Sequence, residues 1–138
     1  TILDVTDGAT VLKANAFQHI SIADPKAAPY GAAGMAVLDA LGLTDAVKSK
    51  IVTAENITQA QQFVDSGNAE LGFVALSQVI GKPATQTWSP PQQDYPVIAQ
   101  DAVLLKAGAD NQAAKDFLDY LKSEEAVAVI RAAGYDVE

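Results

Sequence analysis

Residues 19–42 read HISIADPKAAPYGAAGMAVLDALG, and this stretch decides how the chain folds. Its first five residues alternate in the way typical of a β-strand, and the strand ends at Asp24-Pro25 because proline cannot continue strand pairing. Pro29 suits the first turn of a helix, where its missing N–H costs nothing. Apolar residues then recur at helical spacing up to Gly42, which ends the helix. The stretch therefore predicts a strand followed by a helix.

The same order repeats further along the chain. After a short helix around residues 44–48, residues 51–54 (IVTA) are a second predicted strand, and Asn56 is a suitable N-cap for the helix that follows. Residues 66–68 end that helix, and the continuously apolar run 71–76 predicts a buried third strand. Alternating strands and helices predict right-handed βαβ units on a parallel sheet, which is an α/β fold.

The second half of the chain has a different pattern. Residues 81–96 contain four prolines, which indicates a loop or a crossover, and Trp88 in this loop is expected to be a packing residue. Residues 95–106 are the longest predicted strand. From Asp110 to Gly134 the spacing is helical again, and the positions expected to face inward are Ala114, Phe117, Leu118, Leu121, Ala126, Val127 and Ile130.

Composition excludes several classes of protein. The 138 residues are 49% hydrophobic and carry 9 basic and 17 acidic side chains, a formal charge of −8. This is typical of one soluble globular domain, and the negative charge repels nucleic acid. No apolar run has the roughly 18–20 residues of a membrane span, and no secretion signal opens the chain. Because the first residue is Thr1 and not Met, we expect the chain to be part of something longer.

The residue types also exclude common catalytic sites. His19 is the one histidine and there is no cysteine, so a His/Cys metal centre and a cysteine nucleophile are excluded. Serine-hydrolase elbows, phosphate-binding loops and dinucleotide motifs do not occur. We expect His19 to be structural or exposed. The scattered carboxylates are expected to form a solvated face, namely Asp39, Asp45, Asp65, Asp116, Asp119, Glu124 and Glu125.

Two strand-to-helix junctions remain as candidate sites, at residues 29–31 and 56–58. They are expected at the carboxyl ends of neighbouring parallel strands, where α/β proteins bind ligands. The beginning of a helix offers unpaired N–H groups and the positive end of the helix dipole, which together suit an anion without any Lys or Arg. Ordinary helix caps explain the same residues, so spacing alone leaves both interpretations open.

Several motifs resemble, in order along the chain, those of one protein family. The segments ISIADPKAAPYG (residues 20–31), ENITQA (55–60) and SGNAELGFVALSQ (66–78) are similar to periplasmic molybdate-binding proteins, the solute receptors of molybdate ABC importers. Shorter matches follow at DYPV (94–97), FLDYLK (117–122) and AAGY (132–135). The likeness implies a type II periplasmic binding protein-like fold, in which a tetrahedral oxyanion lies between two lobes.

The resemblance also implies which residues bind. In the family branch whose first junction reads Pro-Tyr-Gly, the tyrosine contributes its N–H and its hydroxyl, and the aliphatic residue of the second junction contributes its N–H. These positions are Tyr30 and Ile57. The tyrosine of the other branch corresponds to Ala75, whose side chain cannot donate. The implied ligand is molybdate or tungstate, with no cofactor and no directly bound metal ion.

The chemistry of the ligand explains the choice of donors. A pocket that only donates hydrogen bonds satisfies an unprotonated dianion, whereas hydrogen phosphate brings a donor that needs an acceptor. The nearest carboxylate, Glu55, is expected to be exposed near the helix cap and away from the pocket. Oxyanion size must then separate molybdate from sulfate.

The family's first lobe, which supplies the opposing Ser/Thr donors, has no counterpart in the chain. We therefore expect residues 1–80 to be the second lobe, and residues 81–138 to be a crossover strand and helices that return to the first lobe. Half a site predicts weak binding of molybdate by this chain alone. The unpaired strand at residues 95–106 predicts a dimer or a strand swap. The implied partner is an ABC permease in the membrane, and the implied location is the periplasm.

Three other functions stay open. A receptor for another tetrahedral oxyanion such as sulfate uses the same donors. The effector-sensing domain of a transcription regulator has a related two-lobed fold, but it needs a DNA-binding segment upstream, and no nucleic-acid partner is expected here. An enzyme needs an acid–base pair at the junctions, for which Tyr30 and Glu55 are the one available combination, without an oriented base. We therefore expect no enzymatic activity.

Overall fold

The computed structural model describes residues 3–137, and the chain divides into two compact units. The first extends to Ile98 and contains the strands that the structure describes, and the second, from Ala99 onward, is helical. The second unit therefore begins further along the chain than the lobe boundary predicted after residue 80. The assignment of residues 1–80 to a second lobe stays a prediction.

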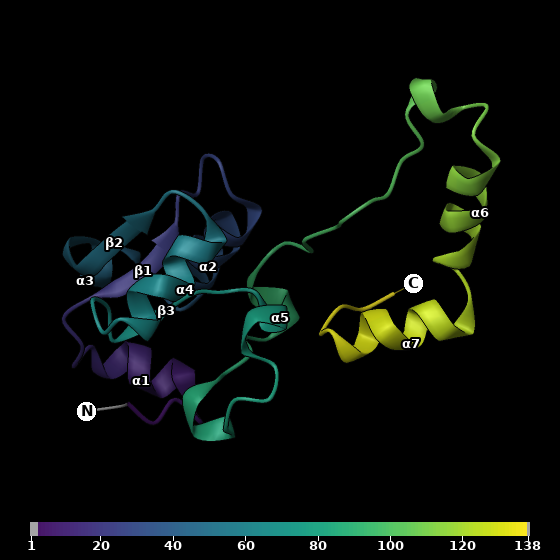
Figure 1. Cartoon of the computed structure of the whole chain (residues 1–138). Helices are drawn as coiled ribbons and strands as arrows, with labels where there is room; N and C mark the ends of the chain where they lie inside the picture. Colours follow the sequence, from purple (N-terminus) through teal and green to yellow (C-terminus); the bar gives the residue numbers. More distant parts are fainter. Residues whose placement is uncertain (1–2, 138) are drawn as a thin grey trace. The chain divides into compact units, whose positions relative to one another are not determined.

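A parallel sheet lies at the centre of the first unit. It consists of β1 (Ile20–Ala23), β2 (Ile51–Ala54) and β3 (Leu71–Gly72) in the order β2-β1-β3 (Figure 1). Both pairings are parallel, and Ile20 is level with Ile51 on one side and with Leu71 on the other. β1 is the central strand, and all four of its residues are buried. The predicted α/β fold with a parallel sheet is confirmed.

Helices cover both faces of this sheet. The first unit contains α1 (Gly8–Ala14), α2 (Pro29–Ala40), α3 (Thr44–Val47), α4 (Ile57–Asp65), α5 (Leu76–Val79) and the 3-10 turns η1 (Lys48–Lys50), η2 (Ala84–Gln86) and η3 (Gln92–Asp94). Ile20 and Ile22 of β1 cluster with Leu38 of α2 on one face. Side chains alternate along a strand, so Ser21 faces the opposite way, toward Val64 of α4 across Gly72. The sheet is therefore enclosed between α2 and α4.

The hydrophobic core lies on the α2 side of the sheet. Its buried residues are Leu12, Phe17, Ile20, Ile22, Leu38 and Val47. Trp88, in the proline-rich loop, packs against this cluster, and a β-carbon at Gly8 of α1 would collide with the Trp88 ring. The same loop is attached to the chain start by a hydrogen bond from Val5 N–H to the Thr85 carbonyl (2.8 Å). Trp88 is thus a packing residue, as expected.

The prediction of a strand at residues 95–106 is wrong. This segment has no strand partner among residues 3–137, and Val97, Val103 and Leu105 are 72%, 77% and 70% exposed. Residues of high strand propensity do not form a strand alone, because an unpaired strand leaves its N–H and C=O groups to water. The third strand is also shorter than the predicted run 71–76. β3 ends at Gly72, and α5 begins at Leu76.

The second unit contains two helices of equal length. These are α6 (Gln112–Tyr120) and α7 (Glu124–Ala132), preceded by the 3-10 turn η4 (Lys106–Gly108). Side-chain oxygens of Asn111 and Ser123 cap the two helices. Of the residues expected to face inward, Ala126 is buried and the others are half-buried, except that Phe117 is 59% exposed, so the prediction is wrong for Phe117. A unit of this size cannot cover the whole apolar stripe of α6.

Among residues 3–137, each helix is too short or too polar to cross a membrane.

Candidate functional site

The two predicted junctions follow neighbouring strands that end at the same level. Ala23, the last residue of β1, pairs with Ala54, the last residue of β2, and Asp24 N–H donates to the Ala54 carbonyl (2.7 Å). α2 begins at Pro29 and α4 at Ile57, so both helices start just beyond the carboxyl edge of the sheet. The predicted placement of the two junctions is confirmed.

The first turn of α2 offers few donors. Pro29 has no N–H, and the N–H groups of Gly31 and Ala32 both donate to the Ala28 carbonyl (3.0 and 3.1 Å). The N-cap residue Ala28 has no side-chain acceptor. Any contribution of this turn to an anion site therefore comes from Tyr30, the half-buried second residue of the helix.

A glycine brings α2 close to the end of β1. Gly31 is buried, and a β-carbon at this position would collide with the carbonyl oxygen of Ala23. No residue with a side chain fits there without moving the backbone, since the obstacle is a peptide group and not the end of a flexible side chain. Gly31 thus fixes the distance between Tyr30 and the sheet edge.

The first turn of α4 has a different pattern. Asn56 Oδ1 accepts a hydrogen bond from Gln59 N–H (2.9 Å), and Gln59 Oε1 accepts one from Glu55 N–H (2.6 Å). These reciprocal contacts resemble a capping box and satisfy two donors around the helix start. Within residues 3–137, the structure records no acceptor for the N–H of Ile57 or of Thr58. α4 therefore presents two adjacent donors at its positive end.

The charged residues at the two junctions do not replace these donors. Lys26 and Glu55 are both exposed, and the Lys26 N–H donates to Asp24 Oδ1 (2.9 Å). The Asp24 carbonyl in turn accepts from the N–H groups of Ala27 and Ala28 (3.1 and 2.8 Å), which closes the turn before α2. Glu55 is placed as predicted from the sequence. The donors that the junctions offer to an anion are thus the neutral N–H groups of Ile57 and Thr58.

The sequence analysis missed two residues of this region, Gln59 and Gln78. Gln59 lies three positions after the N-cap, which is the spacing of a capping box, and this signal could have identified it. Gln78 contacts the Ile57 carbonyl from another element, 21 residues along the chain (3.4 Å). No local pattern predicts such a contact, because it depends on how α5 packs.

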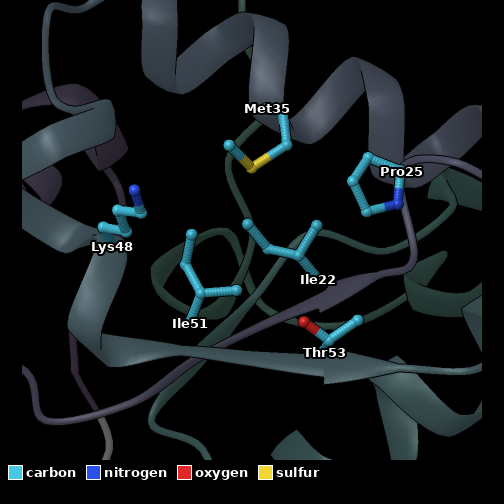
Figure 2. Close-up of a pocket in the computed structure, with 6 residues that line it drawn as sticks. All are labelled: Ile22, Pro25, Met35, Lys48, Ile51 and Thr53. Atoms are coloured by element: carbon cyan, nitrogen blue, oxygen red, sulfur yellow. The ribbon is translucent and has the colours of Figure 1, made fainter.

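A hollow of about 300 Å³ lies elsewhere on the first unit, between α2, β2 and η1. Figure 2 shows its lining, formed by Ile22, Pro25, Met35, Lys48, Ile51 and Thr53. Most of these side chains are apolar, and neither Tyr30 nor Ile57 belongs to the lining. The lining of the hollow therefore differs from the residues of the two junctions.

Comparisons with known proteins agree with the fold. A family model of bacterial extracellular solute-binding proteins matches residues 2–136. The chain is 56% identical over 137 residues to the molybdate-binding protein ModA of Azotobacter vinelandii and 51% identical over 134 residues to ModA of Rhodobacter capsulatus. Each match covers 97% of this chain but 54% and 53% of those proteins, so the chain spans about half the length of these relatives.

A solved structure gives the same result. The periplasmic molybdate-binding protein of Azotobacter vinelandii superposes with a TM-score of 0.82 at 43% sequence identity, over 93% of this chain and 58% of that one. The resemblance noted in the motifs thus extends to the fold and to nearly the whole chain. By its sequence and its α/β architecture, the chain belongs to the bacterial extracellular solute-binding proteins.

Proposed function

We propose that this chain carries part of a binding site for a tetrahedral oxyanion, molybdate or tungstate. The observation that supports the proposal most is the pair of N–H donors at Ile57 and Thr58, at a helix start beside the Tyr30 turn. Two related proteins of similar sequence are molybdate-binding by name. In this proposal Tyr30 contributes its N–H and hydroxyl, and Ile57 contributes its N–H.

The physical basis of binding is hydrogen-bond donation by neutral groups. Molybdate and tungstate carry no proton near neutral pH, so each of their oxygens can only accept hydrogen bonds. A lining of N–H and O–H donors therefore satisfies the whole anion. The positive end of the α4 dipole adds to the attraction for the anion. Because this attraction involves no full counter-charge, the anion can still be released. Because Glu55 is exposed, we do not expect its carboxylate to accept the proton of hydrogen phosphate.

The proposed role is transport and not catalysis. The protein would capture the oxyanion in the periplasm and deliver it to an ABC permease in the membrane, without a cofactor and without a chemical step. The exposure of Glu55, the carboxylate considered as a partner for Tyr30, supports a non-enzymatic role, since a general base has to be held in place beside the group that it deprotonates.

Equilibrium dialysis of the chain against molybdate, tungstate, sulfate and phosphate tests this function. We expect saturable but weak binding of the first two, weaker binding of sulfate and the weakest of phosphate, because a single set of donors leaves much of the dianion in water. Equal binding of phosphate and molybdate would contradict the proposed selectivity. A sub-micromolar dissociation constant for molybdate would contradict the half-site.

A further inference from the structure

One glutamine side chain connects the first turns of α4 and α5. Gln78, in α5, is half-buried, and its Oε1 accepts a hydrogen bond from Ala75 N–H (2.9 Å). Its Nε2 donates to the carbonyl oxygen of Ile57 (3.4 Å). The amide oxygen of Gln78 thus binds the start of α5, and its amide nitrogen binds the start of α4, which belongs to the candidate site.

The Ile57 carbonyl belongs to the same peptide group as the Thr58 N–H. A hydrogen bond to that oxygen restrains the orientation of the peptide plane, and it polarises the group so that the N–H becomes a stronger donor. Because the Thr58 N–H has no acceptor among residues 3–137, this added strength is available to a ligand. The contact therefore acts on one of the two donors that α4 presents.

The first turn of α4 is held by side chains from two directions. Asn56 and Gln59 fix it along the chain, through the N–H groups of Gln59 and Glu55. Gln78 fixes it from α5, the element that follows β3. The chain therefore holds the two donors in place before any ligand arrives, and preorganisation of this kind raises affinity by lowering the cost of ordering the site.

We propose that Gln78 is a positioning residue of the oxyanion site, which orients and strengthens the Thr58 donor through the Ile57 carbonyl. The proposal rests on the proposed function and adds a residue that does not touch the ligand. A neutral amide suits this role, because it supplies a donor for the carbonyl without bringing a negative charge close to a dianion.

The other explanation for Gln78 is a cap for α5 alone. Such a cap needs only the acceptor oxygen that meets Ala75 N–H. Gln78→Glu separates the two roles, since at neutral pH its carboxylate still accepts from Ala75 N–H but cannot donate to the Ile57 carbonyl. Gln78→Leu removes both contacts. Gln62→Glu adds the same charge at an exposed position of α4 and is the matched control.

NMR spectroscopy of the full chain, titrated with molybdate at pH 7.5, tests the proposal. Without ligand, the Ile57 carbonyl carbon resonance is expected to shift in Gln78→Leu and Gln78→Glu but not in Gln62→Glu. Loss of one hydrogen bond is expected to raise the dissociation constant about five- to tenfold in Gln78→Leu. Gln78→Glu is expected to weaken binding at least as much, and Gln62→Glu about twofold or less.

Three results would overturn the proposal, and they are distinguishable. If the wild-type chain binds molybdate and Gln78→Leu binds equally well, the positioning role is wrong while the proposed function stands. If Gln78→Leu does not fold, equal affinities of Gln78→Glu and Gln62→Glu contradict the role in the same way. If the wild-type chain binds no oxyanion, the proposed function fails and this inference fails with it.

Discussion

Gly31 shows how a single missing side chain positions the candidate site. Its α-carbon lies against the carbonyl of Ala23, at the point where α2 passes over the end of β1. The neighbouring residue, Tyr30, can therefore lie close to the sheet edge, because no side chain at position 31 separates α2 from β1. The sequence shows this glycine within the Pro-Tyr-Gly motif. It does not show why a glycine is needed there, because the carbonyl that leaves no room for a side chain belongs to a different element.

Replacing Gly31 by alanine tests this packing. We expect Gly31→Ala to lower the free energy of unfolding by roughly 1–3 kcal/mol, because a backbone carbonyl cannot move aside as a flexible side chain does. Urea denaturation followed by circular dichroism measures the change. Gly67→Ala is the control, since Gly67 has a positive φ of 77° but no atom near its would-be β-carbon. Because Gly31, unlike Gly67, does not have a positive φ, an unchanged or higher stability of Gly31→Ala would contradict the collision.

Glu70 gives the fold a dependence on pH. Its Oε2 accepts a hydrogen bond from the backbone N–H of His19 (2.8 Å), and this bond holds the pKa of the Glu70 carboxyl below its ordinary value of 4.5. A carboxyl with a lowered pKa in the folded state stabilises the fold above its unfolded pKa. That contribution is lost as the pH falls through the lower, folded pKa.

We therefore expect Glu70→Gln to unfold more easily than the wild type at pH 7 and to differ less from it at pH 3. Thermal unfolding across this pH range measures the difference, and subtracting the two curves removes the contributions of Asp4, Asp7 and Asp65, whose pKa values are also lowered by hydrogen bonds. A difference that grows toward acid pH would contradict the assignment.

The α4 helix start is the element on which the candidate site depends most. Asn56 caps it as the sequence predicted, and α4 extends from Ile57 to Asp65. We expect Asn56→Ala to cost about 1 kcal/mol of stability and to weaken molybdate binding, because the first turn loses its anchor. Asn111→Ala is the control, since it removes the equivalent cap of α6 in the second unit (3.2 Å to Ala114 N–H). If both variants bind molybdate as the wild type does, α4 is not part of the site.

The elements predicted correctly are those with strong local signals. Asp24-Pro25 follows β1, α2 begins at Pro29 and Asn56 caps α4, and these elements, like β2, lie where the pattern placed them. The errors concern pairing. Residues 95–106 have the composition of a strand, yet a strand exists only where a partner supplies hydrogen bonds, and composition carries no information on the partner. For the site, the backbone donors were predictable and the side chains that hold them were not.

At the scale of the whole molecule, the main feature is a set of large apolar side chains that are exposed to solvent. Val97, Val103 and Leu105 are at least 70% exposed, a state that soluble proteins avoid for neighbouring large residues. As the sequence analysis proposed, we expect the isolated chain to self-associate through residues 95–106. The net charge of −8 opposes this association, so added salt is expected to strengthen it.

Light scattering over a range of protein and salt concentrations measures this association. We expect Val103→Asp to reduce it, whereas Ala113→Asp, which adds the same charge at an exposed position of α6, serves as the control. A wild-type chain that stays monomeric at high concentration and high salt contradicts the prediction.

Amide NMR spectra of the uniformly labelled wild-type chain, recorded during a molybdate titration, test the central claim most directly. The backbone N–H resonances of Tyr30, Ile57 and Thr58 are predicted to move the most and to follow one binding curve, because these groups would donate to the oxyanion. Shifts centred instead on the hollow around Met35 and Lys48, or no shifts at any molybdate concentration, would contradict the account.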